Sequence, residues 1–139
     1  MPLKPTVIRE YEKYNTRSTF TVSSNFGLGQ PPDCKKLKEG KFKLETDYAG
    51  VTVITRKGDI QREENEKYGM ITEDKIEWIN ECTYRLIPFK VIKNDSKIDL
   101  TTDMKFEMEI IEVKPDSYVQ KTTSRLTGQS LTNEIKIIK

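Results

Sequence analysis

The segment QREENE contains the residues whose type and spacing could best support catalysis. Glu63, Glu64 and Glu66 lie close together in it, and two adjacent carboxylates can act as general acid and general base. The solvated outer face of a strand is the simpler interpretation of the same run. Histidine is absent from the chain, so the commonest general base and the Ser-His and Cys-His nucleophile pairs are missing. We therefore predict that the protein is not an enzyme.

Cys34 and Cys82 are the two cysteines of the chain. Without histidine they cannot complete a four-ligand zinc site, and they do not form a CxxC pair. We therefore expect neither a metal nor another cofactor. The two cysteines could form a disulfide or remain two buried thiols, and the redox compartment decides between these states.

Charge is nearly balanced along the chain, with 24 basic and 22 acidic residues and a net charge of +2. This balance gives no electrostatic footprint for nucleic acid or for an anionic membrane, and it disfavours a five-stranded nucleic-acid-binding barrel. No apolar run in the sequence is long enough to span a bilayer. The segment MPLKPTVIREYEKYN lacks the apolar stretch of a signal peptide. The protein is therefore expected in the cytoplasm, or in the periplasm or outside the cell if a leader has been removed.

From Lys41 onward, the sequence pattern predicts a series of β-strands that would position these residues. MKFEMEI has the clearest period of two, with Met104, Phe106 and Met108 on one face and charged residues on the other. Gly58 in KGD supplies the positive φ of a tight hairpin, and no long helical segment interrupts the series. Eight strands are expected, at residues 41–46, 51–56, 60–66, 75–80, 82–92, 104–110, 117–125 and 133–139.

Pro88 interrupts the longest of these strands. Because proline cannot donate to the ladder, we expect a bulge or an edge there. The inward positions are then expected to change parity after Leu86, to Phe89 and Val91. A meander of antiparallel strands buries its single apolar face most simply by closing into an up-and-down barrel. The predicted fold class is therefore all-β, with an open sandwich of the same strands as the alternative.

This topology brings the two cysteines to the same end of the barrel. If residues 41–46 run upward from the lower end, the fourth strand descends, and Cys82 after it lies at the lower end together with Cys34. A disulfide there would pin the chain across the barrel floor, and in the loop-entropy model it would contribute roughly 4 kcal/mol. Trp78 and Tyr84 would form the floor and the lower wall, and we expect Trp78 to be deeply buried.

Two motifs around the cysteines resemble a group of short bacterial proteins that are typical of Bacteroidota. CKKLKEGKF carries C-x5-G-x-F, and WINECTYRL carries W-x3-C-x-Y-x-L; many members of the group bear a mistaken name as a topoisomerase IV subunit. The resemblance covers residues 34–139 and implies a lipocalin-like, calycin-type barrel. GKF at residues 40–42 stands where lipocalins have G-x-W, and the R-x-Y carboxylate clamp of fatty-acid-binding proteins is not found. The resemblance therefore does not imply a fatty-acid ligand.

Residues 1–33 are interpreted as an N-terminal arm, and residues 34–139 as the barrel domain. In the arm, apolar positions within residues 7–14 have helical spacing, and STFTVSS could form an extra strand. An apolar segment too short to form its own core needs a surface, which is either its own barrel or another chain. We expect the arm to fold back, because Cys34 fixes its exit at the barrel rim.

Two functions follow from this architecture. An eight-stranded barrel is just wide enough to be filled by side chains or to hold one small apolar ligand, so we predict a non-enzymatic, lipocalin-like ligand binder. The alternative is an interaction subunit of a larger envelope or secreted assembly that docks through residues 1–33. A cavity of ~300 Å³ or more would favour the ligand binder, and a filled interior would favour the interaction subunit. The side chains expected in the interior are Phe42, Leu44, Val53, Trp78, Tyr84, Phe106, Met108 and Tyr118.

Overall fold

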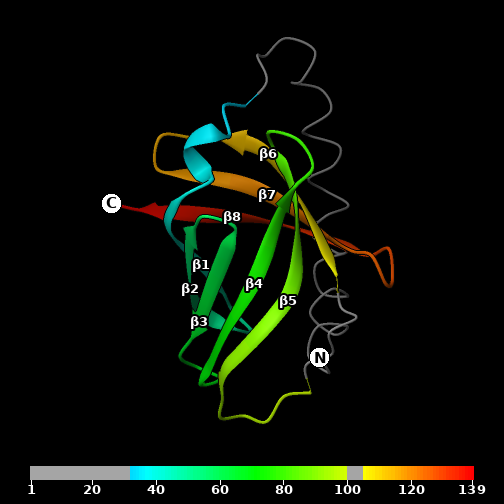
Figure 1. Ribbon diagram of the computed structural model, residues 1–139. Coiled ribbons are helices and arrows are strands. Elements are labelled where there is room, and N and C mark those ends of the chain that lie inside the picture. Colours follow the sequence, from blue (N-terminus) through cyan, green and yellow to red (C-terminus); the bar gives the residue numbers. More distant parts are fainter. Residues whose placement is uncertain (1–31, 100–104) are drawn as a thin grey trace.

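A closed antiparallel β-barrel is formed by the residues that the computed structural model describes, 32–99 and 105–139 (Figure 1). A short 3-10 helix, η1 (Lys35–Leu37), precedes its strands. The strands are β1 (Gly40–Thr46), β2 (Gly50–Lys57), β3 (Ile60–Asn65), β4 (Met70–Trp78), β5 (Thr83–Asn94), β6 (Phe106–Val113), β7 (Ser117–Ser124) and β8 (Ser130–Ile138). They follow one another in chain order, and β8 closes the barrel against β1. The predicted all-β, eight-stranded, up-and-down barrel is confirmed, and the open sandwich is wrong.

Some predictions fall on residues outside the described ranges. They concern the N-terminal arm up to residue 31, with its expected helical turn and extra strand, and Met104 before β6. Among the residues that are described, no helix has the length and the apolar character needed to cross a membrane.

Local sequence accounts for the hairpins and for the inward faces of the strands. Gly58 lies between β2 and β3 with a φ of 62°, as the hairpin prediction for KGD requires. In β6 the alternation is visible in the burial of the side chains, because Met108 and Ile110 are buried whereas Glu109 is exposed. The period of two in this strand therefore places its apolar residues in the core as predicted.

β5 contains the bulge that Pro88 predicts. In the pairing with β4, Pro88 lies opposite Asp74 and Lys90 lies opposite Glu73, so Phe89 is the extra residue between them. An extra residue on one strand bends it and increases its twist. The bulge thus separates the part of β5 that belongs to the barrel wall from the part that continues beyond it.

Val91 was predicted to face the interior, but it does not lie in the core. It is 49% exposed, and its neighbour Ile92 is 42% exposed. A second register shift lies between Ile71 and Thr72 on β4, and β5 pairs with β6 only through residues 83–86. This part of β5 therefore extends past its β6 partner, where no described strand covers it. The predicted inward face is therefore wrong for Val91, and the side chain of Phe89, the other residue of that prediction, lies outside the described part of the structure.

The two ends of the barrel differ in how completely the strands enclose them. β1 pairs with β8 only through residues 41–43 of β1, and β5 pairs with β6 only through residues 83–86. Both seams lie at the end that η1 covers, which we call the closed end. Towards the other end, the open end, the strands of both seams separate. In Figure 1, β7 and β8 run across the direction of β3, β4 and β5.

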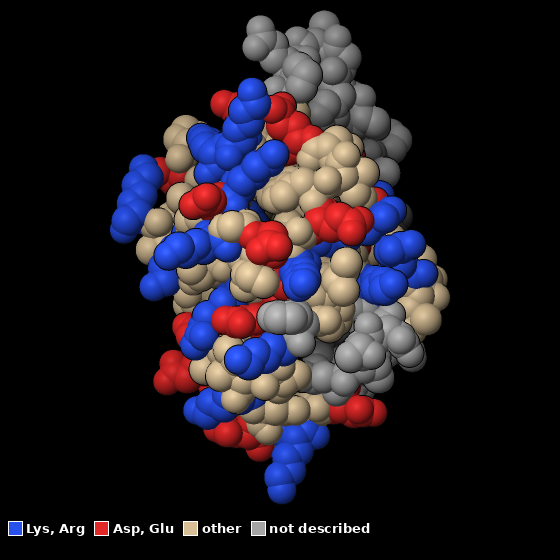
Figure 2. Space-filling view, viewed as in Figure 1, with Lys and Arg blue, Asp and Glu red and all other residues tan. Residues whose placement is uncertain are grey.

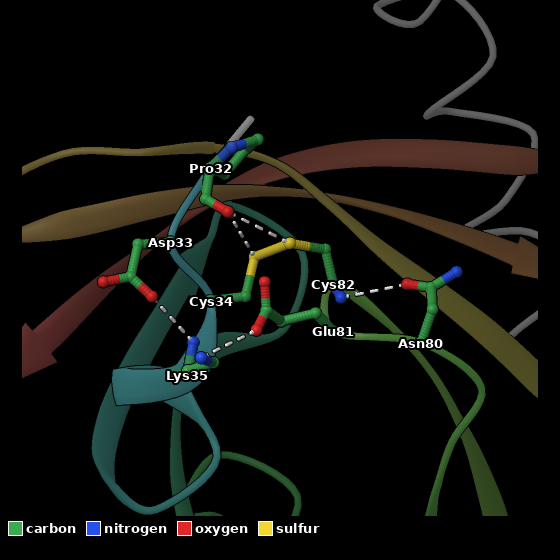
Figure 3. Close-up of polar contacts among 7 residues, drawn as sticks. All are labelled: Pro32, Asp33, Cys34, Lys35, Asn80, Glu81 and Cys82. Carbon is green, nitrogen blue, oxygen red and sulfur yellow. Dashed lines mark hydrogen bonds and ion pairs between the residues drawn. A yellow bond between two sulfur atoms is a disulfide. The ribbon is translucent and has the colours of Figure 1, made fainter. Parts of the chain in front are cut away.

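A disulfide between Cys34 and Cys82 ties the closed end together (Figure 3). The two Cα atoms are 5.4 Å apart, within the range that a disulfide requires. The predicted bridge is confirmed, and the alternative of two buried thiols is wrong. Next to it, Lys35 forms an ion pair with Glu81 at 3.5 Å. The bridge thereby holds η1 across the barrel floor, where Leu37 packs into the main core.

Candidate functional site

A buried arginine lies at the closed end of the barrel. Arg56 is on β2, and it is only 2% exposed. Its Nε donates to Gln61 Oε1 at 2.8 Å, and its Nη1 donates to the carbonyl oxygen of Leu37 in η1 at 2.9 Å. Its Nη2 donates to the hydroxyl oxygens of Tyr84 at 2.7 Å and Tyr118 at 2.8 Å. These bonds satisfy a charge whose burial without partners would strongly destabilise the fold.

Three aromatic rings surround the guanidinium group. Its central carbon lies 4.6 Å from the ring centre of Phe42, 4.9 Å from that of Tyr84 and 5.6 Å from that of Tyr118, where a ring face attracts a cation. Burial disfavours the charged form of Arg56, but the two tyrosines and Glu63 favour it, and the pKa of Arg56 is raised above its ordinary value. Burial also raises the pKa of both tyrosines. Two neutral phenols therefore lie beside a permanent positive charge.

Arg56 fixes the orientation of the side-chain amide of Gln61, because a guanidinium group has only hydrogen-bond donors. Gln61 must turn its oxygen towards the guanidinium group, so its Nε2 points the other way. This nitrogen donates to Glu63 Oε2 at 2.9 Å. These bonds form the first of two branches of a hydrogen-bond network that starts at Arg56. In this branch every donor points away from Arg56, and the branch ends on the carboxylate of Glu63.

The second branch of the network runs through Tyr84. Since the oxygen of Tyr84 accepts a hydrogen bond from Arg56, its hydroxyl hydrogen is free to donate to Gln120 Oε1 at 2.5 Å. Nε2 of Gln120 then donates to Thr122 Oγ1 at 3.3 Å. The polarity of this branch is thus also set by Arg56.

A cavity of about 190 Å³ lies beside this network, on the side of the open end. Both branches of the network reach it, since Glu63 and Thr122 are part of its lining. Asp74 on β4 adds a second carboxylate to the lining, whereas Arg56 itself does not contribute. The apolar walls are formed by Leu44, Ile54, Leu86, Pro88, Phe106, Met108, Leu131 and Ile135. The cavity therefore combines apolar walls with a polar floor that is held rigidly from below.

The structure places the eight residues predicted for the interior in three environments. Phe42 and Tyr118 are buried below the cavity floor, where their rings pack edge to face with centres 5.5 Å apart. Val53 and Trp78 lie outside the cavity lining. The remaining residues line the cavity, and they are Leu44, Tyr84, Phe106 and Met108.

Val53 faces outward, which corrects its predicted place in the interior. Its neighbour Ile54 is buried and lines the cavity, and alternation puts Val53 on the opposite face of β2. There it pairs with Lys43 and Glu64 and borders an outer groove. The run VTVITR has its valines on one face and Ile54 with Arg56 on the other. Its apolar residues therefore do not identify the inward face.

Trp78 is half-buried, so the prediction of deep burial is wrong. The ring centres of Trp78 and Tyr84 lie 4.8 Å apart. Lys38 Nζ lies 5.1 Å from the ring centre of Trp78. The floor position expected for Trp78 is taken by Leu37 of η1, which the disulfide holds in place. Trp78 therefore covers the rim of the closed end rather than its centre.

The three glutamates considered for acid–base chemistry do not come together. Glu63 lines the cavity. Glu64 faces outward, where its Oε1 lies 3.0 Å from Nη2 of Arg62, and Glu66 is exposed in the turn after β3. Neighbouring residues of a strand point to opposite faces, so a run of glutamates in β3 is divided between the interior and the surface.

Arg56, Gln61 and Gln120 were not predicted as interior residues, although all three are buried. For Arg56 a signal exists, since it shares the parity of Ile54, and an arginine on an apolar strand face indicates a buried cation with partners. Gln61 and Gln120 give no such signal, because a glutamine in a strand is usually found on the exposed face. Both glutamines owe their place in the network to Arg56. Gln61 accepts a hydrogen bond from Arg56 directly, and Gln120 is linked to it through Tyr84.

The fold and the interior site define a small, closed, up-and-down β-barrel with a cavity above a buried arginine. Within residues 32–99 and 105–139, no three His, Cys, Asp or Glu side chains form a group that could hold a metal ion. Comparison of the chain with protein-family models, with curated proteins and with solved structures gave no match. The function is therefore argued from the site itself.

Proposed function

We propose that this protein is a non-enzymatic barrel that binds one small, mainly apolar molecule in its interior cavity. The observation that carries the proposal is the cavity, with about 190 Å³ of space between eight apolar side chains and a polar floor. A fully packed interior leaves few voids larger than a water molecule. Because an apolar cavity of ~150 Å³ can hold benzene, the ligand would be a single ring with a short substituent or a short chain.

The cavity is smaller than the ~300 Å³ expected of an ordinary ligand site, but the interior is not filled either. Its size limits the ligand to a small one. The polar floor supports binding rather than proton transfer, since burial raises the pKa of Tyr84 and Arg56 fixes its hydroxyl oxygen. Groups that are held in one orientation select a ligand by its own donors and acceptors.

The disulfide supports a location in an oxidising compartment, such as the periplasm or the cell exterior, because cytosolic thiols are kept reduced. A closed eight-stranded barrel is also the shape that the resemblance of residues 34–139 to lipocalin-like proteins implies. A carrier or sensor of a small molecule outside the cytoplasm is the role that these observations support together.

Titration with ethylbenzene, followed by amide NMR shifts, tests this function. We expect saturable shifts at residues that line the cavity. Ile54→Phe places a ring in the cavity and should abolish these shifts, whereas Val53→Phe places the same ring on the outward face of the same strand and should leave them unchanged. Absence of saturable shifts in the unchanged protein would contradict the proposal.

A subunit of a larger envelope or secreted assembly is the second candidate function. The observation in its favour is the extended part of β5, where Val91 and Ile92 are exposed and the described strands provide pairing on the β4 side only. A strand edge with exposed apolar residues can pair with another chain. Basic and acidic side chains are interspersed on the face in Figure 2. Docking would therefore rest on apolar contact and depend little on salt.

Deletion of residues 1–30 tests whether an assembly depends on the N-terminal arm. If the arm docks on a partner, the truncated protein should keep its melting temperature and lose the partner or a second copy in size-exclusion chromatography. If the arm packs on its own barrel, as we expect, the melting temperature should fall while the assembly state stays the same.

A further inference from the structure

We propose that the cavity selects a ligand that carries a cationic amine, and that Glu63 is the group that binds it. This inference rests on the proposed ligand-binding function and adds the chemical class of the ligand. The arrangement behind it is an apolar cavity whose floor presents a carboxylate, while the only buried cation nearby among the described residues, Arg56, is engaged below the floor.

The charged side chains that line the cavity are both acidic. Glu63 extends from β3 and Asp74 from the neighbouring β4, and no lysine or arginine of the described ranges takes part in the lining. Each nitrogen of the Arg56 guanidinium group donates to a protein oxygen. An anionic ligand, such as a fatty acid, would therefore meet carboxylates in the cavity and no available guanidinium group.

The hydrogen bonds of the floor point to the same class of ligand. The amide nitrogens of Gln61 and Gln120 are directed to Glu63 Oε2 and to Thr122, so neither points to a ligand. Glu63 Oε1 accepts no hydrogen bond from any described residue. Thr122 and Asn133 also line the cavity, but they are neutral, so the attraction that Glu63 feels comes from Arg56 below the floor and not from the lining. A ligand with a positively charged donor would complete the hydrogen bonding of Glu63.

The apolar walls strengthen this preference. Leu86, Phe106 and Ile135 are among the apolar side chains that line the cavity, and a contact between an ammonium group and a carboxylate is stronger beside apolar side chains than in bulk water. A volume of about 190 Å³ leaves room for one ring or short chain together with the amine. An arylalkylamine or a short alkylamine fits both the size and the charge.

Three probes of similar size test the charge preference on the full-length protein at neutral pH. Benzylamine carries an ammonium group, ethylbenzene is its neutral isostere, and benzoate carries a carboxylate. NMR titrations in one buffer give the three dissociation constants. We expect benzylamine to bind about tenfold more tightly than ethylbenzene, as a charge-assisted hydrogen bond implies. Benzoate should show no saturable binding.

A matched pair of variants assigns the preference to one carboxylate. Glu63→Gln keeps the size of the side chain and removes its charge, so benzylamine and ethylbenzene should then bind equally. Glu64→Gln makes the same change on the outward face of β3 and should keep the preference. Asp74→Asn should reduce the preference by a smaller factor. An undiminished preference in Glu63→Gln would overturn the assignment to Glu63.

The outcomes separate this inference from the proposed function. Equal affinities of benzylamine and ethylbenzene in the unchanged protein, or tighter binding of benzoate, would overturn the inference and leave the ligand-binding function intact. Failure of all three probes to bind would contradict the proposed function, and the inference with it. The comparison of the probes needs no variant, so it decides the matter even if Glu63→Gln does not fold.

Discussion

The closed end and the open end of the barrel are made of the same strands but are stabilised differently. At the closed end, one disulfide holds η1 in place and Arg56 binds side chains or backbone from η1, β3, β5 and β7. At the open end, a separate and smaller cluster consists of Leu131 with Tyr48 and Phe106 packed against it. The cavity lies between these two ends. A rigid floor below a loosely enclosed space suits a site that a ligand must enter.

Removal of Arg56 should have the largest effect on this contrast. Arg56→Ala leaves the carbonyl oxygen of Leu37 and Gln61 without their donor and creates a void at the closed end. The free energy of unfolding should fall by about 3–5 kcal/mol in urea titrations. Arg62→Ala, which removes ion pairs with Glu64 and Glu73 on the outer face, should cost about 0–1 kcal/mol. Similar losses for the two variants would show that the buried network does not hold the closed end.

Loss of the disulfide should have the next largest effect. Replacement of Cys34 and Cys82 by serine releases a link across 48 positions of the chain and should lower the free energy of unfolding by about 2–4 kcal/mol. Thermal unfolding measures the change. A reductant should lower the melting temperature of the unchanged protein and leave that of the double variant as it is. An equal response of both proteins to the reductant would contradict this role of the bridge.

Alkaline pH should weaken the closed end to a smaller extent. Burial raises the pKa of Tyr84 and Tyr118 above the value of about 10 in an unfolded chain, so the folded state binds these protons more tightly. The resulting stability is fully present below about pH 10 and decreases above it by about 1.4 kcal/mol per pH unit for each tyrosine. Urea midpoints across this range measure the decrease, which should be smaller in Tyr84→Phe. A profile that stays flat above about pH 10 would refute the prediction.

Truncation of the exposed part of β5 should have the smallest effect. Val91→Ala should change the free energy of unfolding by about 0.5 kcal/mol or less, because the side chain is largely exposed. Ile76→Ala on β4, in the core of the closed end, should cost about 2–5 kcal/mol. Denaturant titrations of the two variants compare the ends directly. A large loss for Val91→Ala would mean that the open end is packed as firmly as the closed end.

The barrel itself could be predicted because its determinants are local. Alternation in MKFEMEI, the glycine of KGD and the proline at 88 each act within a few residues, and together they set the number and the order of the strands. The place of the disulfide followed from the same order, because antiparallel strands of a meander alternate in direction. Val53, Trp78 and Val91 were placed wrongly because periodicity does not say which face is inward, or where a strand leaves the barrel.

The candidate site could not be predicted because its determinants are distant in the chain. Arg56, Tyr84 and Tyr118 are on β2, β5 and β7, and nothing in the local sequence of any of these strands indicates the other two. The size of the cavity depends on how side chains from opposite walls fill the interior, which only the three-dimensional packing determines. The sequence drew attention to Glu63 because Glu64 and Glu66 lie next to it in the chain. In the structure, the residue that positions its carboxylate is Gln61, which donates a hydrogen bond to it.

The seam between β8 and β1 has a consequence for the order of events during synthesis. β1 emerges from the ribosome long before β8, so one of its edges stays unpaired until the last strand has been made. Pairings between distant segments form slowly, and exposed strand edges in the meantime promote aggregation. Cys34 and Cys82 both precede β6, so during export into an oxidising compartment their bridge can form before the second half of the barrel has arrived. We expect this early covalent link to hold the first five strands together until β8 arrives to close the wall.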